Sequence, residues 1–110
     1  MANYILVVLT NAQPGRDDDF NAWYDDVHLR DVCAVPGILA ARRYMAAPIQ
    51  PAPDGARWRY LAIYEIETDN LQGVMDEMNA RAGTDQMFVS DSLDVAGACA
   101  TVFGAFSEQG

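Results

Sequence analysis

Residues 58–67 constrain the fold more than any other stretch, because their side chains alternate in the way typical of a β-strand. One face would carry Trp58, Tyr60, Ala62, Tyr64 and Ile66, and the other Arg59, Leu61, Ile63, Glu65 and Glu67. Both faces are apolar in the middle, and apolar surface needs cover. A sheet that contains this strand must therefore be covered on both sides.

Three further strands are expected. Residues 4–10 form a short, continuously apolar run with β-branched side chains, which suits a strand covered on both faces. Residues 38–47 predict a second strand and residues 98–106 a final one. Residues 48–56 contain three prolines and Asp54-Gly55, which predicts a loop between the two middle strands.

Two helices are expected between the strands. The first begins at the acidic turn Asp17-Asp18-Asp19, and Pro36 requires it to end by Val35. The second is expected to start at a capping pair of Asp69 and Gln72 and to end at Gly83. Its apolar stripe consists of Leu71, Val74, Met75, Met78 and Ala82. Residues 84–97 are mixed, with room for a short helical turn through Met87 and Phe88.

This order of elements predicts an α+β fold of the ferredoxin-like βαββαβ type, with a four-stranded antiparallel sheet and two helices on one face. The 110 residues would form one domain, residues 1–110. Two helices can cover only one face of the sheet. We therefore expect a second copy of the chain to cover the other face, as a homodimer.

Composition narrows the functional classes. The net charge of −9 repels phosphate backbones and anionic headgroups, so we expect no nucleic acid and no membrane partner. The two cysteines, Cys33 and Cys99, lie far apart, and no signal peptide precedes the first strand, which favours a cytoplasmic protein with free thiols. The motifs that bind metals, phosphates or dinucleotides are absent. The sequence therefore favours chemistry without a metal or cofactor.

The candidate chemistry is concentrated in residues 23–37, which contain the only histidine of the chain. On a helix, Tyr24, His28 and Asp31 would share one face, with Asp25 beside them. An imidazole can take and give a proton near neutral pH, and a carboxylate can orient it. Equally, a lone histidine near a helix end can simply cap the last carbonyls or be a half-buried side chain with its hydrogen bonds satisfied. A nucleophilic pair of Cys33 and His28 is disfavoured, because residues five apart point to different faces of an α-helix.

Aromatic and cationic residues could form the wall of a substrate site. The candidates are Trp23, Arg42, Tyr44, Trp58, Tyr60 and Tyr64. Trp23 lies on the apolar stripe of the first helix, which favours a core position. Arg42 and Arg43 point to opposite faces of the second strand. Both could reach water at a strand end, or one could enter an acidic pocket and bind an anionic or phenolic group.

The run from Trp23 to Asp31, the close at Val35-Pro36-Gly37 and the following Ala41-Arg42-Arg43-Tyr44 resemble the EthD-type branch of the dimeric α/β-barrel superfamily. The resemblance covers nearly the whole chain in element order. It departs at Arg30, where relatives tend to carry proline two residues after the histidine. It implies a dimeric α/β barrel whose pocket lies between the sheet and its helices, and a small cofactor-free enzyme that acts on aromatic or polyketide-like molecules.

Three functions follow as hypotheses. In the first, the chain is a cofactor-independent lyase (dehydratase) or isomerase (cyclase). His28 moves a proton, Asp31 or Asp25 orients its ring, and Tyr24 hydrogen-bonds an oxygen of the substrate. In the second, the chain is a non-catalytic ligand-binding or assembly module. In the third, it is a cofactor-free monooxygenase, in which the base makes a carbanion that reacts with oxygen.

Overall fold

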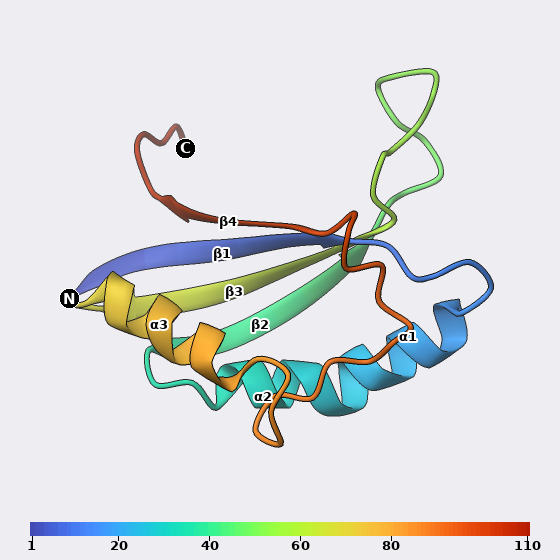
Figure 1. Ribbon diagram of the computed structural model, residues 1–110. Helices are drawn as coiled ribbons and strands as arrows, with labels where there is room; N and C mark the ends of the chain where they lie inside the picture. Colours follow the sequence, from blue (N-terminus) through green and yellow to red (C-terminus); the bar gives the residue numbers. More distant parts are fainter.

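The computed structural model describes residues 1–110 and contains a four-stranded antiparallel sheet packed against helices (Figure 1). The elements in chain order are β1 (Ala2–Thr10), α1 (Asp17–Trp23), η1 (Tyr24–His28), α2 (Leu29–Cys33), β2 (Ile38–Met45), β3 (Tyr60–Thr68), α3 (Leu71–Arg81) and β4 (Cys99–Gly104). The strand order is β2-β3-β1-β4, and every neighbouring pair is antiparallel. The predicted ferredoxin-like fold is confirmed.

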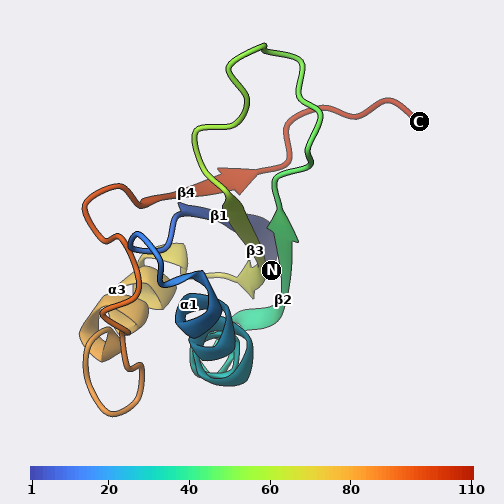
Figure 2. The same cartoon turned by 90° about the vertical axis from the view of Figure 1, so that its right-hand side faces the viewer.

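The helices all cover the same face of the sheet, as Figure 2 shows. The core lies between these two layers and is built around the buried side chains Leu6, Tyr24, Tyr64 and Ile66. The opposite face of the sheet is uncovered by the chain. There Ile5 of β1 and Phe103 of β4 are cross-strand neighbours, and both are exposed. The loop before β3 and the C-terminal tail also extend away on the side opposite the helices (Figure 1).

The first helix is continuous from Asp17 to Cys33, but it contains a π-helical turn, η1, which was not predicted. A π turn is wider than an α turn because each N–H bonds the carbonyl five residues earlier. It brings side chains five apart onto one face, and the rings of Trp23 and His28 lie only 4.5 Å apart. The helix ends before Pro36, as predicted.

Gly37 sets the distance between the end of this helix and α3. Its φ is +98°, in the left-handed region that favours glycine. A Cβ at this position would lie 2.9 Å from a methyl group of Val74 on α3. The sharp turn and the close approach both require glycine here.

Four local predictions are corrected. β3 starts at Tyr60, so Trp58 lies before the strand and its indole Nε1 donates to the carbonyl of Gly97. The cap of α3 is Asn70 and not Asp69, because the Asn70 side chain accepts a hydrogen bond from the N–H of Gly73. Residues 84–97 form turns and isolated bridges without a helix, and β4 ends at Gly104.

None of the helices has the length and apolar character needed to cross a lipid bilayer.

Candidate functional site

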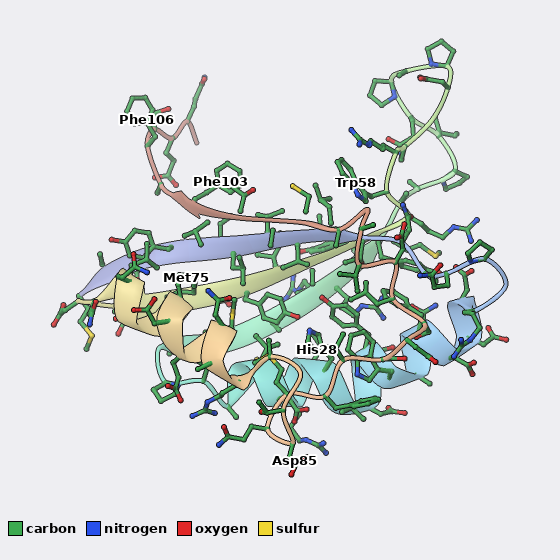
Figure 3. The ribbon with its side chains drawn as sticks, in the orientation of Figure 1. His28, Trp58, Met75, Asp85, Phe103 and Phe106 are labelled. Atoms are coloured by element: carbon green, nitrogen blue, oxygen red, sulfur yellow. The ribbon has the colours of Figure 1, made fainter.

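A pocket of about 170 Å³ lies between the sheet and the helices, and His28 is part of its wall. Figure 3 shows His28 between the first helix and the sheet. The lining residues come from β1, β3, β4, both helices and the following loop: Leu6, Val8, His28, Val32, Tyr64, Met78, Asn79, Ala82, Met87 and Ala100. Most are apolar, and none of them carries a permanent charge. Such a pocket favours a small, uncharged and largely apolar molecule.

The imidazole of His28 is packed between aromatic rings. The ring of Trp23 lies 4.5 Å away at 30°, and the ring of Tyr24 meets it edge-on at 4.9 Å. Nδ1 is buried and has no hydrogen-bond partner. The side chain makes no hydrogen bond to a helix carbonyl, so it does not cap the helix as the alternative interpretation required.

This environment favours the neutral form of His28. The pKa of the imidazole is lowered to about 4, mainly by burial; the negative charge of Asp31 opposes this shift, and the positive charge of Arg43 adds to it. At neutral pH the ring is therefore uncharged. A neutral imidazole has one nitrogen that can accept a proton, and Nδ1 is shielded, which leaves Nε2 as the atom able to meet a bound molecule.

Tyr64 and Tyr24 form a pair of buried phenols beside His28. The hydroxyl of Tyr64 donates a hydrogen bond of 3.1 Å to the hydroxyl of Tyr24. Burial raises the pKa of both hydroxyls, so both stay protonated. Tyr64 lines the pocket, whereas Tyr24 lies behind it against the rings of His28 and Trp23.

The two carboxylates expected to orient His28 do not hydrogen-bond to it. Asp31 lies near enough to influence the imidazole, but its nearest cationic partner is its neighbour Arg30, at 3.6 Å. Asp25 points elsewhere and forms a 2.9 Å ion pair with Arg43. The orienting contact from Asp25 is therefore absent. A helical i, i+3 spacing does not produce it, because the turn between these residues is a π turn.

The two arginines of β2 are divided between the faces of the sheet. Arg42 pairs with Ile63 and is exposed on the open face, away from the His28 pocket. Arg43 pairs with Ala62 on the helix face and lies over the ring of Tyr24, with 4.3 Å between the guanidinium carbon and the ring centre. The sequence named Arg42 as a candidate but left open which of the two arginines faces the site. The buried side chains of Tyr60, Ala62 and Tyr64 mark the helix face of β3. Which arginine of β2 shares that face follows only from the register between β2 and β3.

The predicted aromatic wall is dispersed. Only Tyr64 lines the His28 pocket. Tyr44, Trp58 and Tyr60 border a separate hollow of about 200 Å³ near the end of β2 and the start of β3, and the Tyr60 hydroxyl donates to Asp17 at 2.6 Å. Trp23 supports the His28 ring from outside the pocket, and its Nε1 donates to the carbonyl of Phe88 at 3.1 Å.

Only His28 and Tyr64 of the ten lining residues were predicted as site residues; the other eight were missed, and three of them were not expected on any core face. Asn79 lies beside Met78 at the edge of the α3 stripe, Met87 belongs to the irregular segment, and Ala100 is on β4. The register of β4 against β1 places Ala100 opposite Val8, and no sequence signal gives that register. No three His, Cys, Asp or Glu side chains are grouped closely enough to hold a metal ion.

Solved structures of known proteins share this arrangement. An EthD-like protein from Ralstonia eutropha aligns with a TM-score of 0.70 at 11% identity, over 99% of this chain and 96% of that one. The fold is that of the EthD-like proteins. The resemblance noted in the sequence is thereby confirmed as a resemblance of fold, although the chain matches no family model and no curated protein sequence.

Two other solved structures extend the comparison. A proposed monooxygenase from Shewanella loihica aligns over 97% of both chains with a TM-score of 0.64 and 12% identity. A dimeric ferredoxin-like protein of unknown function from Jannaschia aligns with a TM-score of 0.60 and 12% identity, over 94% of this chain and 99% of that one. Similar folds thus occur in a protein described as dimeric and in a proposed monooxygenase.

Proposed function

We propose that the chain is a cofactor-independent lyase or isomerase that acts on a small aromatic or polyketide-like molecule, with His28 as the general base. The observation that carries the proposal is the single neutral imidazole in the wall of a largely apolar pocket. In the proposed reaction, Nε2 of His28 takes a proton from a carbon or hydroxyl group of the substrate and returns it at another position. Such proton transfer contributes about 10²–10⁴-fold to a rate.

The phenol pair has a supporting role in this proposal. Tyr64 is a protonated hydroxyl in the wall of the pocket and is bonded to Tyr24. A substrate oxygen in the pocket could draw the Tyr64 proton away from Tyr24, so that negative charge developing on that oxygen is stabilised by a hydrogen bond. Tyr24 would then hold Tyr64 in place instead of contacting the substrate itself. Asp31 contributes through its charge, because it offsets part of the burial cost of the protonated ring.

The size and lining of the pocket indicate the scale of the substrate. A cavity of about 150 Å³ is enough for a benzene-sized molecule, and this pocket measures about 170 Å³. A single aromatic or enolic ring with one oxygen substituent would fit within that volume. The absence of a charged residue from the pocket lining disfavours a carboxylate or phosphate on the buried part of the ligand.

The experiment is turnover of a panel of single-ring phenols and enolisable ring ketones by the wild type and by His28→Gln. Glutamine retains a polar side chain but cannot act as a base at neutral pH. The proposal requires at least one compound to be converted by the wild type and about 10²-fold more slowly by the variant. An equal rate in a folded variant would remove His28 from the mechanism.

A cofactor-free monooxygenase is the second candidate, supported by the proposed monooxygenase among the structural neighbours. The same base would form a carbanion that reacts directly with oxygen. Oxygen consumption in step with product formation would assign this reaction, whereas turnover without oxygen would assign the lyase or isomerase. A protein that binds panel compounds and converts none of them would support the non-catalytic alternative.

We further propose that the working form is a homodimer formed through the open face of the sheet. Ile5 and Phe103 are exposed there as neighbours, and Leu39 and Tyr44 of β2 add to the exposed apolar surface. Apolar patches of this kind are usually covered in solution. A structural neighbour with this fold is described as dimeric.

A further inference from the structure

Arg43 occupies an unusual position for a charged side chain. Only 14% of the side chain is exposed, and the residue lies on the face of β2 that meets the helices. Its guanidinium carbon is 4.3 Å from the ring centre of Tyr24 and about 5.5 Å from those of Phe20 and Tyr60. A cation at these distances is attracted by the faces of aromatic rings. Arg43 thus connects β2 to the first helix through Tyr24.

The two terminal nitrogens of Arg43 hold the helix at two points. One donates to Oδ1 of Asp25 and the other to Oδ1 of Asn21, each at 2.9 Å. Asn21 belongs to α1 and Asp25 to the π turn, so the two acceptors lie on either side of the point where the α-helix becomes the π turn. The planar guanidinium offers two nitrogens at a fixed separation that suits this pair of acceptors, whereas a lysine would have to reach both from one nitrogen and without a planar group to stack on Tyr24.

The π turn sets the direction of His28. It contains one more residue than an α turn, and in an α-helix each residue rotates the chain by about 100°. If the turn relaxed to regular α-helix, the residues after it would rotate by about that angle relative to α1. His28 would then lose its contact with the ring of Trp23 and turn away from the pocket.

We infer that Arg43 is the positioning residue of this site: by binding Asn21 and Asp25 and stacking on Tyr24, it holds the π turn in the register that directs His28 into the pocket. The importance of this role for catalysis rests on the proposed function, but the positioning itself does not. The hydrogen bonds and ring contacts of Arg43 are made to residues outside the pocket lining, so it acts on the reaction through His28 and the phenol pair.

The single histidine makes this inference directly measurable, because the imidazole gives one set of signals in an NMR titration. The titratable or charged groups near it are Asp31 on α2, Arg43 on β2, Tyr24 on the π turn and Tyr64 on β3. The pocket residues from α3 and the following loop, Met78, Asn79, Ala82 and Met87, do not titrate. A change in the titration of His28 therefore reports on this small set of groups and on the burial of the ring.

The experiment compares Arg43→Met, Arg43→Lys and the matched control Arg42→Met, which removes an equal charge from the neighbouring residue on the open face. We expect the pKa of His28 to rise from about 4 toward the ordinary value of about 6.5 in both Arg43 variants and to stay unchanged in Arg42→Met. An unchanged pKa in Arg43→Met would overturn the inference. A wild-type pKa in Arg43→Lys would also overturn it, because charge alone would then account for the effect.

Asn21→Ala covers the case in which Arg43→Met fails to fold, since it removes one acceptor, adds no charge and leaves the stacking intact. We expect the His28 pKa to rise in the same direction by a smaller amount, and no change would contradict the inference. These titrations need no substrate. If His28→Gln keeps full turnover while Arg43→Met shifts the titration, the proposed function fails and the positioning role stands. If His28→Gln loses turnover while Arg43→Met leaves the titration of His28 unchanged, the positioning role fails and the proposed function stands.

Discussion

The hydroxyl of Tyr64 donates a 3.1 Å hydrogen bond to the hydroxyl of Tyr24 in the buried layer between sheet and helix. Each phenol provides the other's partner, and Tyr64 also faces the pocket that contains His28. The helix that bears the candidate base is thus connected to the central strand β3 next to the site. The polar part of the site and the core of the fold share the same side chains.

The first prediction concerns this bond. Tyr64→Phe and Tyr24→Phe should each lower the free energy of unfolding by about 1–3 kcal/mol, because each leaves a buried hydroxyl without its partner. The double variant should lose clearly less than the sum, since it removes both hydroxyls together. Urea denaturation of the four proteins measures the coupling. Strictly additive losses would show that the two hydroxyls do not interact.

The second prediction concerns the pH dependence of stability. The folded pKa of His28 is about 4, below the unfolded value of about 6.5, so the unfolded chain binds the proton more tightly. The contribution of His28 is therefore fully present above about pH 6.5 and is lost as the pH falls toward 4. It amounts to about 3 kcal/mol at most.

His28→Gln is the control for this effect, because it lacks the titrating group and keeps the carboxylates. The difference in unfolding free energy between the wild type and this variant should shrink as the pH is lowered from 7 to 4.5. A difference that stays constant over this range would mean that the imidazole is solvated and not buried.

The third prediction separates the two candidate caps of α3. Asn70→Ala should destabilise the protein by about 0.5–2 kcal/mol, because the N–H of Gly73 loses its acceptor. Asp69→Ala is the matched control. Asp69 is exposed and forms only a long ion pair with the N-terminus at 3.7 Å, so its removal should change thermal stability little. A larger loss of stability in Asp69→Ala than in Asn70→Ala would instead identify Asp69 as the cap.

The fourth prediction tests the open face of the sheet. Phe103→Glu places a charge beside Ile5 in the middle of the proposed dimer contact, so it should convert a dimer into a monomer in analytical ultracentrifugation. Val95→Glu alters an exposed apolar residue in the segment before β4 and should leave the dimer intact. A wild type that sediments as a monomer at all concentrations would contradict the proposed assembly.

Much of the architecture could be predicted from the sequence because it depends on local patterns. The alternation through Tyr60, Ala62, Tyr64 and Ile66 marks a strand, and Pro36 ends the first helix, whatever the rest of the chain does. The capping of α3 was harder, since Asp69 and Asn70 are both good capping residues. Which of them caps depends on backbone angles that their side-chain chemistry does not determine.

The site itself depended on features that local patterns do not reveal. The π turn at Tyr24–His28 changes which side chains meet, and helical spacing alone therefore predicted a contact between Asp25 and His28 that is absent. The choice between Arg42 and Arg43 required the register of β2 against β3. His28 itself was identified by its rarity and its neighbours, and the structure places it in the wall of a pocket.

The most direct measurement is an NMR titration of the single imidazole with phenol, in the wild type and in Ala100→Phe, whose larger side chain would fill the pocket from β4. The account predicts a saturable change in the His28 signals of the wild type and none in the variant. His28 signals that do not change when phenol is added, or that change equally in both proteins, would contradict the claim that His28 faces a pocket able to hold a small ring.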